Sequence, residues 1–213
     1  MAGVFITFEG GEGAGKSTHI KLLADTLKSK GHAVVVTREP GGTTQGDGVR
    51  ALLVTGDVRR WSPMAEALLN YAARDAHLNE VIRPALAAGK IVLCDRFMDS
   101  TRAYQGHAGG VDMAFIDDLE RRVVGKTRPD LTLVFDLPAA DGLRRARLRQ
   151  DAGPGAAEDR FEQKDLSFHH ELRAGFLAIA AADPRRCKVV DATRPLALVG
   201  ADVLGHVLSV VDG

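Results

Sequence analysis

The chain has 213 residues, of which 45% are hydrophobic and 26% are charged. These values are ordinary for a globular protein of one domain and exclude disorder of the whole chain. Its 28 Lys and Arg residues equal its 28 Asp and Glu residues. We therefore expect no nucleic acid polymer as a partner, because proteins that bind one usually carry a basic surplus. No apolar run approaches the length of about 18 residues that predicts a membrane span. Two cysteines are too few for a disulfide framework, which favours a reducing, cytoplasmic location.

Short β-rich apolar runs alternate with longer helical segments along the chain. The predicted strands are 4–8, 33–37, 91–94, 131–135 and 188–190. The predicted helices are 17–30, 62–88 with a bend near Pro84, 112–124, 141–149, 161–182 and 197–211. The segments 38–45 and 151–157 are rich in loop residues, and the second is expected to be flexible. This alternation predicts an α/β fold of right-handed βαβ units with five parallel strands.

Glycines cluster directly after the first predicted strand, where a parallel sheet usually binds ligands. The segment reads Gly10, Gly11, Glu12, Gly13, Ala14, Gly15, Lys16, Ser17, Thr18. It matches the phosphate-loop pattern G-x-x-x-x-G-K-[ST], with the required strand before it and helix after it. In such a loop backbone N–H groups surround phosphate oxygens, Lys16 neutralises the β- and γ-phosphates, and the Ser17 hydroxyl coordinates Mg²⁺. The sequence therefore predicts binding of ATP with magnesium.

Further charged residues follow the other predicted strands. Asp95 ends an apolar run and is interpreted as an acid that orients the metal, together with Ser17. Arg96 comes directly after it, and an arginine fork can bind phosphate through two hydrogen bonds. Three more arginines are candidates for a second anion site: Arg38, Arg50 and Arg74.

Together with the phosphate loop, several short sequence motifs occur in the same order as in a known family. They are Arg38-Glu39-Pro40-Gly41-Gly42-Thr43, Tyr71-Ala72-Ala73-Arg74, Asp95-Arg96-Phe97, Ala103-Tyr104-Gln105-Gly106 and Asp191-Ala192-Thr193. Over essentially its whole length the chain resembles thymidylate kinases. The resemblance implies a P-loop nucleoside monophosphate kinase fold in one domain, 1–213, with a mobile lid at about 144–160. It also implies transfer of a phosphoryl group from ATP to dTMP, a homodimer, and a role in making DNA precursors.

The resemblance assigns the acceptor site residue by residue. Arg96 resembles the arginine that holds the dTMP phosphate, with Asp95 beside the reacting groups and Arg38 and Arg50 near the same site. Arg74 and Gln105 resemble the groups that read the edge of the thymine. Thr101 and Tyr104 would line the sugar and base pocket, and Glu12 resembles the acid that contacts the 3′-hydroxyl. Asn70 stands where the family usually has an aromatic residue that stacks on thymine.

The resemblance also implies a catalytic arginine in the lid, because the phosphate loop here contains none. Arg149 is our choice for this role, beside Lys16, Asp95 and Arg96 as catalytic residues, and Arg145 is expected to cover the adenine. Other members of the basic cluster are Arg144, Arg147 and Arg160. A solvated basic helix face is the alternative interpretation of this cluster.

Two other functions remain open at this stage. One is a different nucleoside monophosphate or deoxynucleoside kinase, which a panel of acceptors would reveal. The other is a regulatory module that binds nucleotide but lacks an acceptor site.

Overall fold

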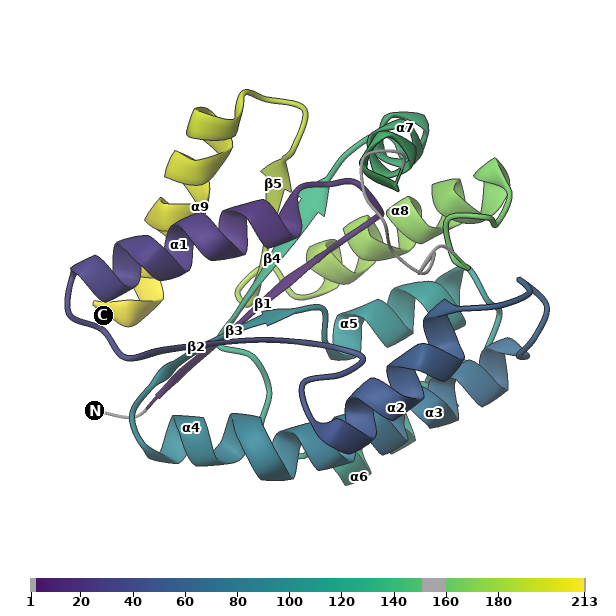
Figure 1. The fold of residues 1–213 in the computed structure, drawn as a ribbon, viewed down its shortest axis with the longest axis horizontal. Helices are drawn as coiled ribbons and strands as arrows, with labels where there is room; N and C mark the ends of the chain where they lie inside the picture. Colours follow the sequence, from purple (N-terminus) through teal and green to yellow (C-terminus); the bar gives the residue numbers. More distant parts are fainter. Residues whose placement is uncertain (1–2, 151–159, 213) are drawn as a thin grey trace.

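The computed structural model describes residues 3–150 and 160–212. Five parallel strands form one sheet in the order β2-β3-β1-β4-β5. Their bounds are Val4–Gly10 (β1), Val34–Arg38 (β2), Ile91–Asp95 (β3), Leu131–Asp136 (β4) and Cys187–Asp191 (β5). Each predicted strand is present within a few residues. The parallel sheet with helices on both faces confirms the predicted α/β, P-loop kinase fold (Figure 1).

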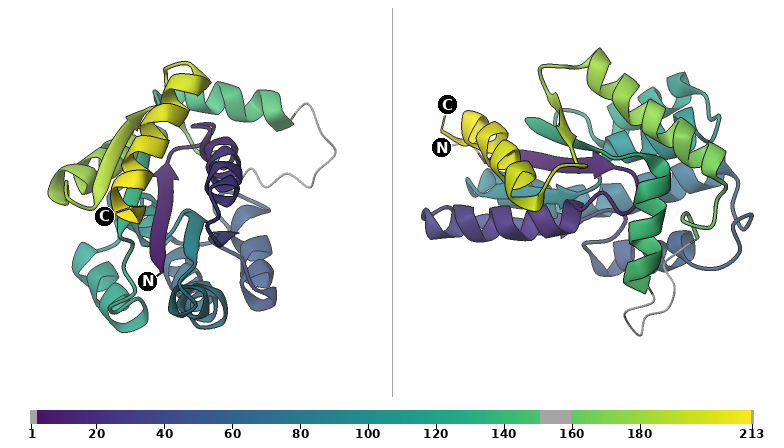
Figure 2. Two further views of the ribbon diagram at one scale, coloured as in Figure 1. Left: turned by 90° about the vertical axis from the view of Figure 1, so that its left-hand side faces the viewer. Right: turned by 90° about the horizontal axis from the view of Figure 1, so that it is seen from above.

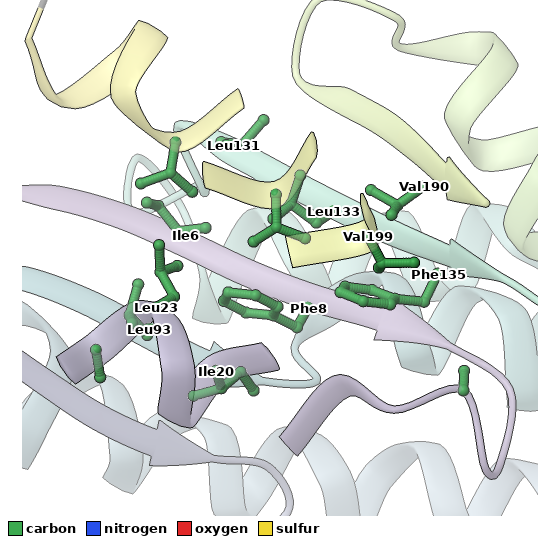
Figure 3. Packing of buried hydrophobic residues seen from close by; sticks show 14 of the residues in the cluster. Ile6, Phe8, Ile20, Leu23, Leu93, Leu131, Leu133, Phe135, Val190 and Val199 are labelled. Atoms are coloured by element: carbon green, nitrogen blue, oxygen red, sulfur yellow. The ribbon is translucent and has the colours of Figure 1, made fainter. Parts of the chain in front are cut away.

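The helices divide between the two faces of the sheet. Lys16–Ser29 (α1) and Leu196–Val211 (α9) lie on one face (Figures 1 and 2). Figure 3 shows the core beneath them, where Ile6, Phe8 and Phe135 of the sheet meet side chains such as Leu23 and Val199. The opposite face is covered beside β1 and β3 by a long helical segment and Met113–Val123 (α6), and beside β4 and β5 by Leu166–Ala182 (α8). In the central strand β3, Ile91 and Leu93 face the first core and Val92 and Cys94 face the opposite one, which is why the apolar run of this strand is continuous.

The long helical segment predicted at 62–88 consists of three parts that follow one another directly. They are Pro63–His77 (α3), a wide π-helical turn at Leu78–Ile82 (η1) and Arg83–Ala87 (α4). Ser62 caps the start, and its side chain accepts a hydrogen bond from the N–H of Ala65, as the Ser-Pro pair predicts. Pro84 follows the wide turn directly within this continuous helical segment, and the altered hydrogen-bond pattern of the turn accommodates a residue that has no N–H to donate.

Two helical segments are absent from the sequence-based prediction. Thr44–Val54 (α2) was not expected, because Gly46 and Gly48 lower its helix propensity. It begins because the Thr43 side chain accepts a hydrogen bond from Gly46 N at 2.9 Å. The segment after β3 is also helical, as Met98–Thr101 (α5) and the wide turn Arg102–His107 (η2).

The last helices differ little from their predicted ranges. Ala139–Gln150 (α7) replaces 141–149. Leu166–Ala182 (α8) begins later than the predicted 161, because the Asp165 side chain caps it by accepting from Phe168 N at 2.9 Å. The loop predicted at 151–157 lies outside the described residues. None of the helices within 3–150 and 160–212 is both long and apolar enough to cross a membrane.

Candidate active site

The phosphate loop connects β1 to α1 at the carboxyl edge of the sheet. Gly13 and Gly15 adopt positive φ angles of 64° and 87°, which side chains with a Cβ atom rarely adopt. Gly15 is the N-cap of α1, so the helix begins at Lys16 with its unpaired N–H groups directed at the loop. This arrangement provides a binding site for a polyphosphate.

The first turns of α7 pack directly on this loop. A Cβ atom on Gly13 would lie 2.1 Å from the carbonyl oxygen of Gly142, and a Cβ atom on Gly142 would lie 2.4 Å from that of Glu12. Both distances are shorter than any normal contact, so two glycines are needed for the backbones to approach this closely. Figure 1 shows α7 beyond the carboxyl end of β4, on the same side as the loop.

Lys16 is held across the loop and is only 7% exposed. Its Nζ donates to the carbonyl oxygens of Gly10 at 3.1 Å and Gly11 at 2.9 Å. Burial, and then repulsion by Arg96, lower the pKa of Lys16 to about 8, although nearby carboxylates oppose this change. A bound polyphosphate would supply the negative charge that this partly desolvated cation lacks.

Ser17 and Asp95 come together because β1 and β3 are neighbours. Phe8 is paired with Asp95 in the register of these strands. The Ser17 hydroxyl donates to Asp95 Oδ2 at 2.8 Å. Hydroxyl and carboxylate oxygens suit Mg²⁺, which in nucleotide sites is bound by few protein ligands and by phosphate oxygens and water. Among the described residues no group of three or more His, Cys, Asp or Glu side chains could hold a metal alone. The oxygen donors of Ser17 and Asp95 fit a magnesium ion that is also bound by a nucleotide.

The backbone of Arg96 is strained. Its φ angle of 68° is in the left-handed region, which is uncommon for a residue other than glycine. Arg96 N donates to the carbonyl oxygen of Phe8 at 2.9 Å, and this bond to β1 helps to hold the conformation. Strain of this kind concentrates at functional sites, where it directs a side chain to a required position.

The Arg96 guanidinium lies between the phosphate loop and the neighbouring pocket. Nη1 donates to Gly10 O at 2.9 Å, and Nη2 donates to Glu12 Oε1 at 3.0 Å. The group also lies 5.0 Å from the centre of the Tyr104 ring. Burial disfavours its charged form, but Tyr104 and Glu12 hold the pKa of Arg96 above its ordinary value. A permanent positive charge is thus fixed at this point.

Glu12 is the negative partner of this arginine. Its Oε1 also accepts a hydrogen bond of 2.5 Å from the Tyr104 hydroxyl. Burial alone would raise the pKa of Glu12, but the charges of Arg96 and Lys16 and the Tyr104 hydroxyl lower it to about 2. Glu12 is therefore ionised at neutral pH and can accept hydrogen bonds only.

A pocket opens beside Arg96 and Glu12, away from the phosphate loop. The space between its walls, including the part open to solvent, is about 630 Å³. The walls are formed by Glu12, Glu39, Pro40, Arg50, Leu53, Val54, Asn70, Arg96, Ser100, Thr101, Tyr104, Gln105, Phe161 and Glu162. Charged side chains thus line the pocket both beside the phosphate loop, as Glu12 and Arg96 do, and elsewhere, where Leu53, Val54 and Phe161 add apolar surface.

The pocket brings together most of the residues predicted for the acceptor site. Seven of the nine line it: Glu12, Arg50, Asn70, Arg96, Thr101, Tyr104 and Gln105. Arg50 Nη1 donates to Pro40 O at 3.1 Å. Arg38 lies instead on a neighbouring cleft that it shares with Ser17 and Asp95.

Arg74 lies behind the pocket wall and is 1% exposed. Its Nε donates to Glu39 Oε2 at 2.7 Å, and its Nη2 donates to Phe97 O at 3.0 Å. Both terminal nitrogens also donate to the Thr101 hydroxyl at 3.2 Å. In this structure Arg74 supports Glu39 and Thr101, which do line the pocket, and does not face the pocket itself.

The arginines predicted for the lid occupy different positions. Arg145 Nη1 donates to the carbonyl oxygen of Ala192, in the loop after β5. Arg144 pairs with Asp141 on the same helix, and Arg147 is exposed. Arg149 belongs to the last turn of α7, and its side chain lies outside the described part of the structure.

Several pocket residues were not predicted as site residues. Leu53 and Val54 end α2, the helix that the glycines concealed. Glu39 and Pro40 belong to the motif that begins at Arg38, from which the sequence predicts only the arginine as a site residue. Phe161 follows the predicted lid. The sequence offers little to identify it, beyond its being an aromatic residue next to Arg160. Pro40, Leu53, Val54 and Phe161 supply most of the apolar wall of the pocket.

The parallel sheet, the phosphate loop and the adjoining pocket define a P-loop kinase. The Thymidylate kinase family model matches residues 8–203. The chain belongs to the thymidylate kinase family. It is 57% identical to a thymidylate kinase of Caulobacter vibrioides over 94% of both chains. It is 52% identical to that of Syntrophotalea carbinolica, over 90% of this chain and 89% of the relative. The crystal structure of thymidylate kinase from Ehrlichia chaffeensis has a TM-score of 0.77 and 33% identity, over 97% of this chain and all of that one.

Proposed function

We propose that this protein transfers the γ-phosphoryl group of ATP to dTMP and releases ADP and dTDP. The observation that carries the proposal is the position of Arg96. It lines the acceptor pocket and also donates to Gly10 of the phosphate loop. An anion in the loop and a phosphate at the near end of the pocket would therefore meet beside one fixed cation. The relatives with 52–57% identity, which are named thymidylate kinases, support dTMP as the acceptor.

Phosphoryl transfer depends mainly on positioning and on neutralising charge. Lys16 would neutralise the β- and γ-phosphates, and Arg96 would hold the dTMP phosphate in line with them. An oxygen of that phosphate then bonds to the γ-phosphorus, while the bond from the γ-phosphorus to the bridging oxygen breaks and ADP leaves. Ser17 and Asp95 would hold Mg²⁺, which when bound neutralises charge on the phosphate oxygens.

The proposal includes the donor side and the domain organisation. The whole chain would act as one domain, with the lid at about 144–160. Arg149 would stabilise the charge of the transition state, and Arg145 would cover the adenine. The bond from Arg145 to Ala192 supports this role, because it places the side chain at the carboxyl edge of the sheet.

A panel of acceptors tests the activity. Purified protein with ATP and Mg²⁺ is given dTMP, dUMP, dCMP, dGMP, AMP or thymidine, and ADP release is measured. We expect dTMP to give the highest kcat/KM. A higher value for another monophosphate would assign a different kinase. Nucleotide binding without stimulation by any acceptor would instead support a regulatory module.

We also propose a homodimer in the cytoplasm. Met64 and Leu68 are 40% and 48% exposed and lie one turn apart on α3, so they present an apolar strip to solvent. Both cysteines are free and buried, which suits a reducing compartment. Light scattering of the purified protein measures the mass directly. A monomer at micromolar concentration would contradict the dimer.

A further inference from the structure

Three buried polar side chains, hydrogen-bonded in series, lie at the wall of the acceptor pocket. Arg160 is 0% exposed, and Glu66 and Gln105 are each 2% exposed. Arg160 Nη2 donates to Glu66 Oε1 at 2.6 Å, and Gln105 Nε2 donates to Glu66 Oε2 at 2.8 Å. Each oxygen of the Glu66 carboxylate therefore has its own donor. Of the three, only Gln105 lines the pocket.

Arg160 is fixed from several directions. Besides Glu66, its guanidinium donates to the carbonyl oxygens of Leu53, Asp57 and Val58, each at 3.0 Å. Four of its five N–H groups are thus used inside the protein. These bonds connect Arg160, the last residue of the predicted lid, to the end of α2 and the loop that follows, so this residue is fixed in the interior. They leave the cation no freedom to approach a bound phosphate, so Arg160 differs from the arginines of α7.

The carboxylate of Glu66 determines which way the Gln105 amide points. An ionised carboxylate only accepts hydrogen bonds, so the amide must turn its NH₂ group toward Glu66. The opposite orientation would bring two acceptor oxygens together, with no proton between them. The carbonyl oxygen, Oε1, is consequently the polar atom that Gln105 offers to the pocket.

An acceptor at this position discriminates between pyrimidines. Thymine and uracil carry a proton on N3, whereas N3 of cytosine is an unprotonated acceptor. A fixed carbonyl oxygen can accept from the first two and opposes the lone pair of the third. A buried site built for one hydrogen bond rejects a molecule that cannot form it, because polar groups are then left unpaired.

We propose that Glu66 and Arg160 are positioning residues that make the pocket selective for a pyrimidine with an N3 proton, because they fix the orientation of the Gln105 amide. Neither residue lines the pocket. Arg160 fixes the carboxylate, the carboxylate fixes the amide, and the amide presents its oxygen to the base. This inference rests on the proposed function, since it requires a pyrimidine nucleotide in the pocket.

Glu66→Gln is the direct test, because the hydrogen-bond pattern then reverses. Arg160 can only donate, so the new side chain must turn its carbonyl oxygen toward Arg160 and its NH₂ group toward Gln105. Gln105 must then turn its own oxygen toward residue 66 and present NH₂ to the pocket. We expect the ratio of kcat/KM for dTMP to that for dCMP to fall at least tenfold, mainly through KM for dTMP. KM for ATP should not change.

The double variant Glu66→Gln with Gln105→Glu restores an acceptor to the pocket. The amide at 66 would accept from Arg160 and donate to the carboxylate at 105, whose second oxygen faces the base. The charge of the pair is the same as in the wild type. We expect the dTMP to dCMP ratio to return to within tenfold of the wild-type value. This variant also keeps the test open if the single variant does not fold.

A matched control is Glu120→Gln, which also removes a buried carboxylate paired with arginine. Glu120 is 4% exposed and pairs with Arg102 and Arg128, and none of these three residues lines the pocket. It should lower the melting temperature without altering the acceptor ratio. A folded Glu66→Gln variant whose ratio falls less than tenfold would overturn the inference, as would a double variant that loses selectivity. Failure of the proposed function is distinct, because the wild-type protein would then not phosphorylate dTMP.

Discussion

Glu9, in β1 directly before the phosphate loop, is a buried carboxyl group whose ionisation should destabilise the fold. It is 0% exposed. Its Oε1 accepts from Phe97 N at 2.8 Å, and its Oε2 accepts from the Ser100 hydroxyl at 2.5 Å. Burial, and then the negative charge of Asp99, raise the pKa of Glu9 from 4.5 to about 8 despite these hydrogen bonds. The folded protein therefore keeps this proton at a pH where the unfolded chain has lost it.

The sign of the effect follows from linkage between proton binding and folding. Because the pKa is higher in the folded state, the stabilisation is fully present below about pH 4.5 and is lost as the pH rises through about 8. Within this window the free energy of unfolding falls by about 1.4 kcal/mol per pH unit from this group. The loss by pH 7 is on the order of 3 kcal/mol. For a chain of this length it corresponds to a fall in Tm of roughly 6–12 °C.

Unfolding by urea at pH 5, 6, 7 and 8 would measure this loss in the wild type and in Glu9→Gln. The amide imitates the protonated carboxyl group, since it can accept from Phe97 N and donate to the Ser100 hydroxyl. Subtracting the two profiles removes the contributions of other groups. We expect the variant to gain stability relative to the wild type as the pH rises.

A surface carboxylate provides the control for this experiment. Asp118 is half-buried at the surface of α6 and pairs with Arg121 and Arg122, and the hydrogen bond from Arg122 lowers the pKa of Asp118 below its ordinary value. Asp118→Asn should thus displace the stability profile by a constant amount between pH 5 and 8. Parallel profiles for wild type and Glu9→Gln would refute the reasoning about Glu9.

Four substitutions test the remaining site residues. Lys16→Ala should abolish transfer in a folded protein, because the charge on the β- and γ-phosphates is then not neutralised; near-normal turnover would exclude the assigned role. Arg96→Ala should lower kcat/KM for dTMP by an amount equivalent to about 2–5 kcal/mol, and equal losses for ATP and dTMP would mean a structural role. Arg149→Ala should lower kcat far more than either apparent affinity, and the same result from Arg147→Ala alone would transfer the role to that residue. Asn70→Phe should tighten dTMP binding by about 1 kcal/mol in calorimetry through stacking, whereas weaker binding would mean that the space is already filled.

The fold could be predicted because its signals are local. The order of strands and helices follows from apolar runs, caps and glycines that act over a few residues. The phosphate loop could be predicted for the same reason, since the residues that would bind phosphate all lie in one short segment. Thr44–Val54 was missed because two glycines weaken the helical pattern, and a side-chain cap and packing against α3 stabilise it in compensation.

The acceptor pocket was only partly predictable, because its walls come from segments distant in sequence. Phe161 and Leu53 are more than 100 residues apart, and no local pattern places them on one pocket. The motif around Arg74 indicated a functional site, but it could not show that Glu39 and Thr101 bind the guanidinium from within. Burial of a charged side chain depends on which partners the fold brings near it.

Because the backbones of Gly13 and Gly142 approach so closely, the phosphate loop cannot shift toward α7 without displacing the base of that helix. With a rise of 1.5 Å per residue, the 12 residues of α7 form a helix about 18 Å long. A rotation of this helix by about 10° at its base would move its C-terminal end by about 3 Å. Entry of a polyphosphate into the loop can therefore be transmitted to the backbone that carries Arg145 and Arg149.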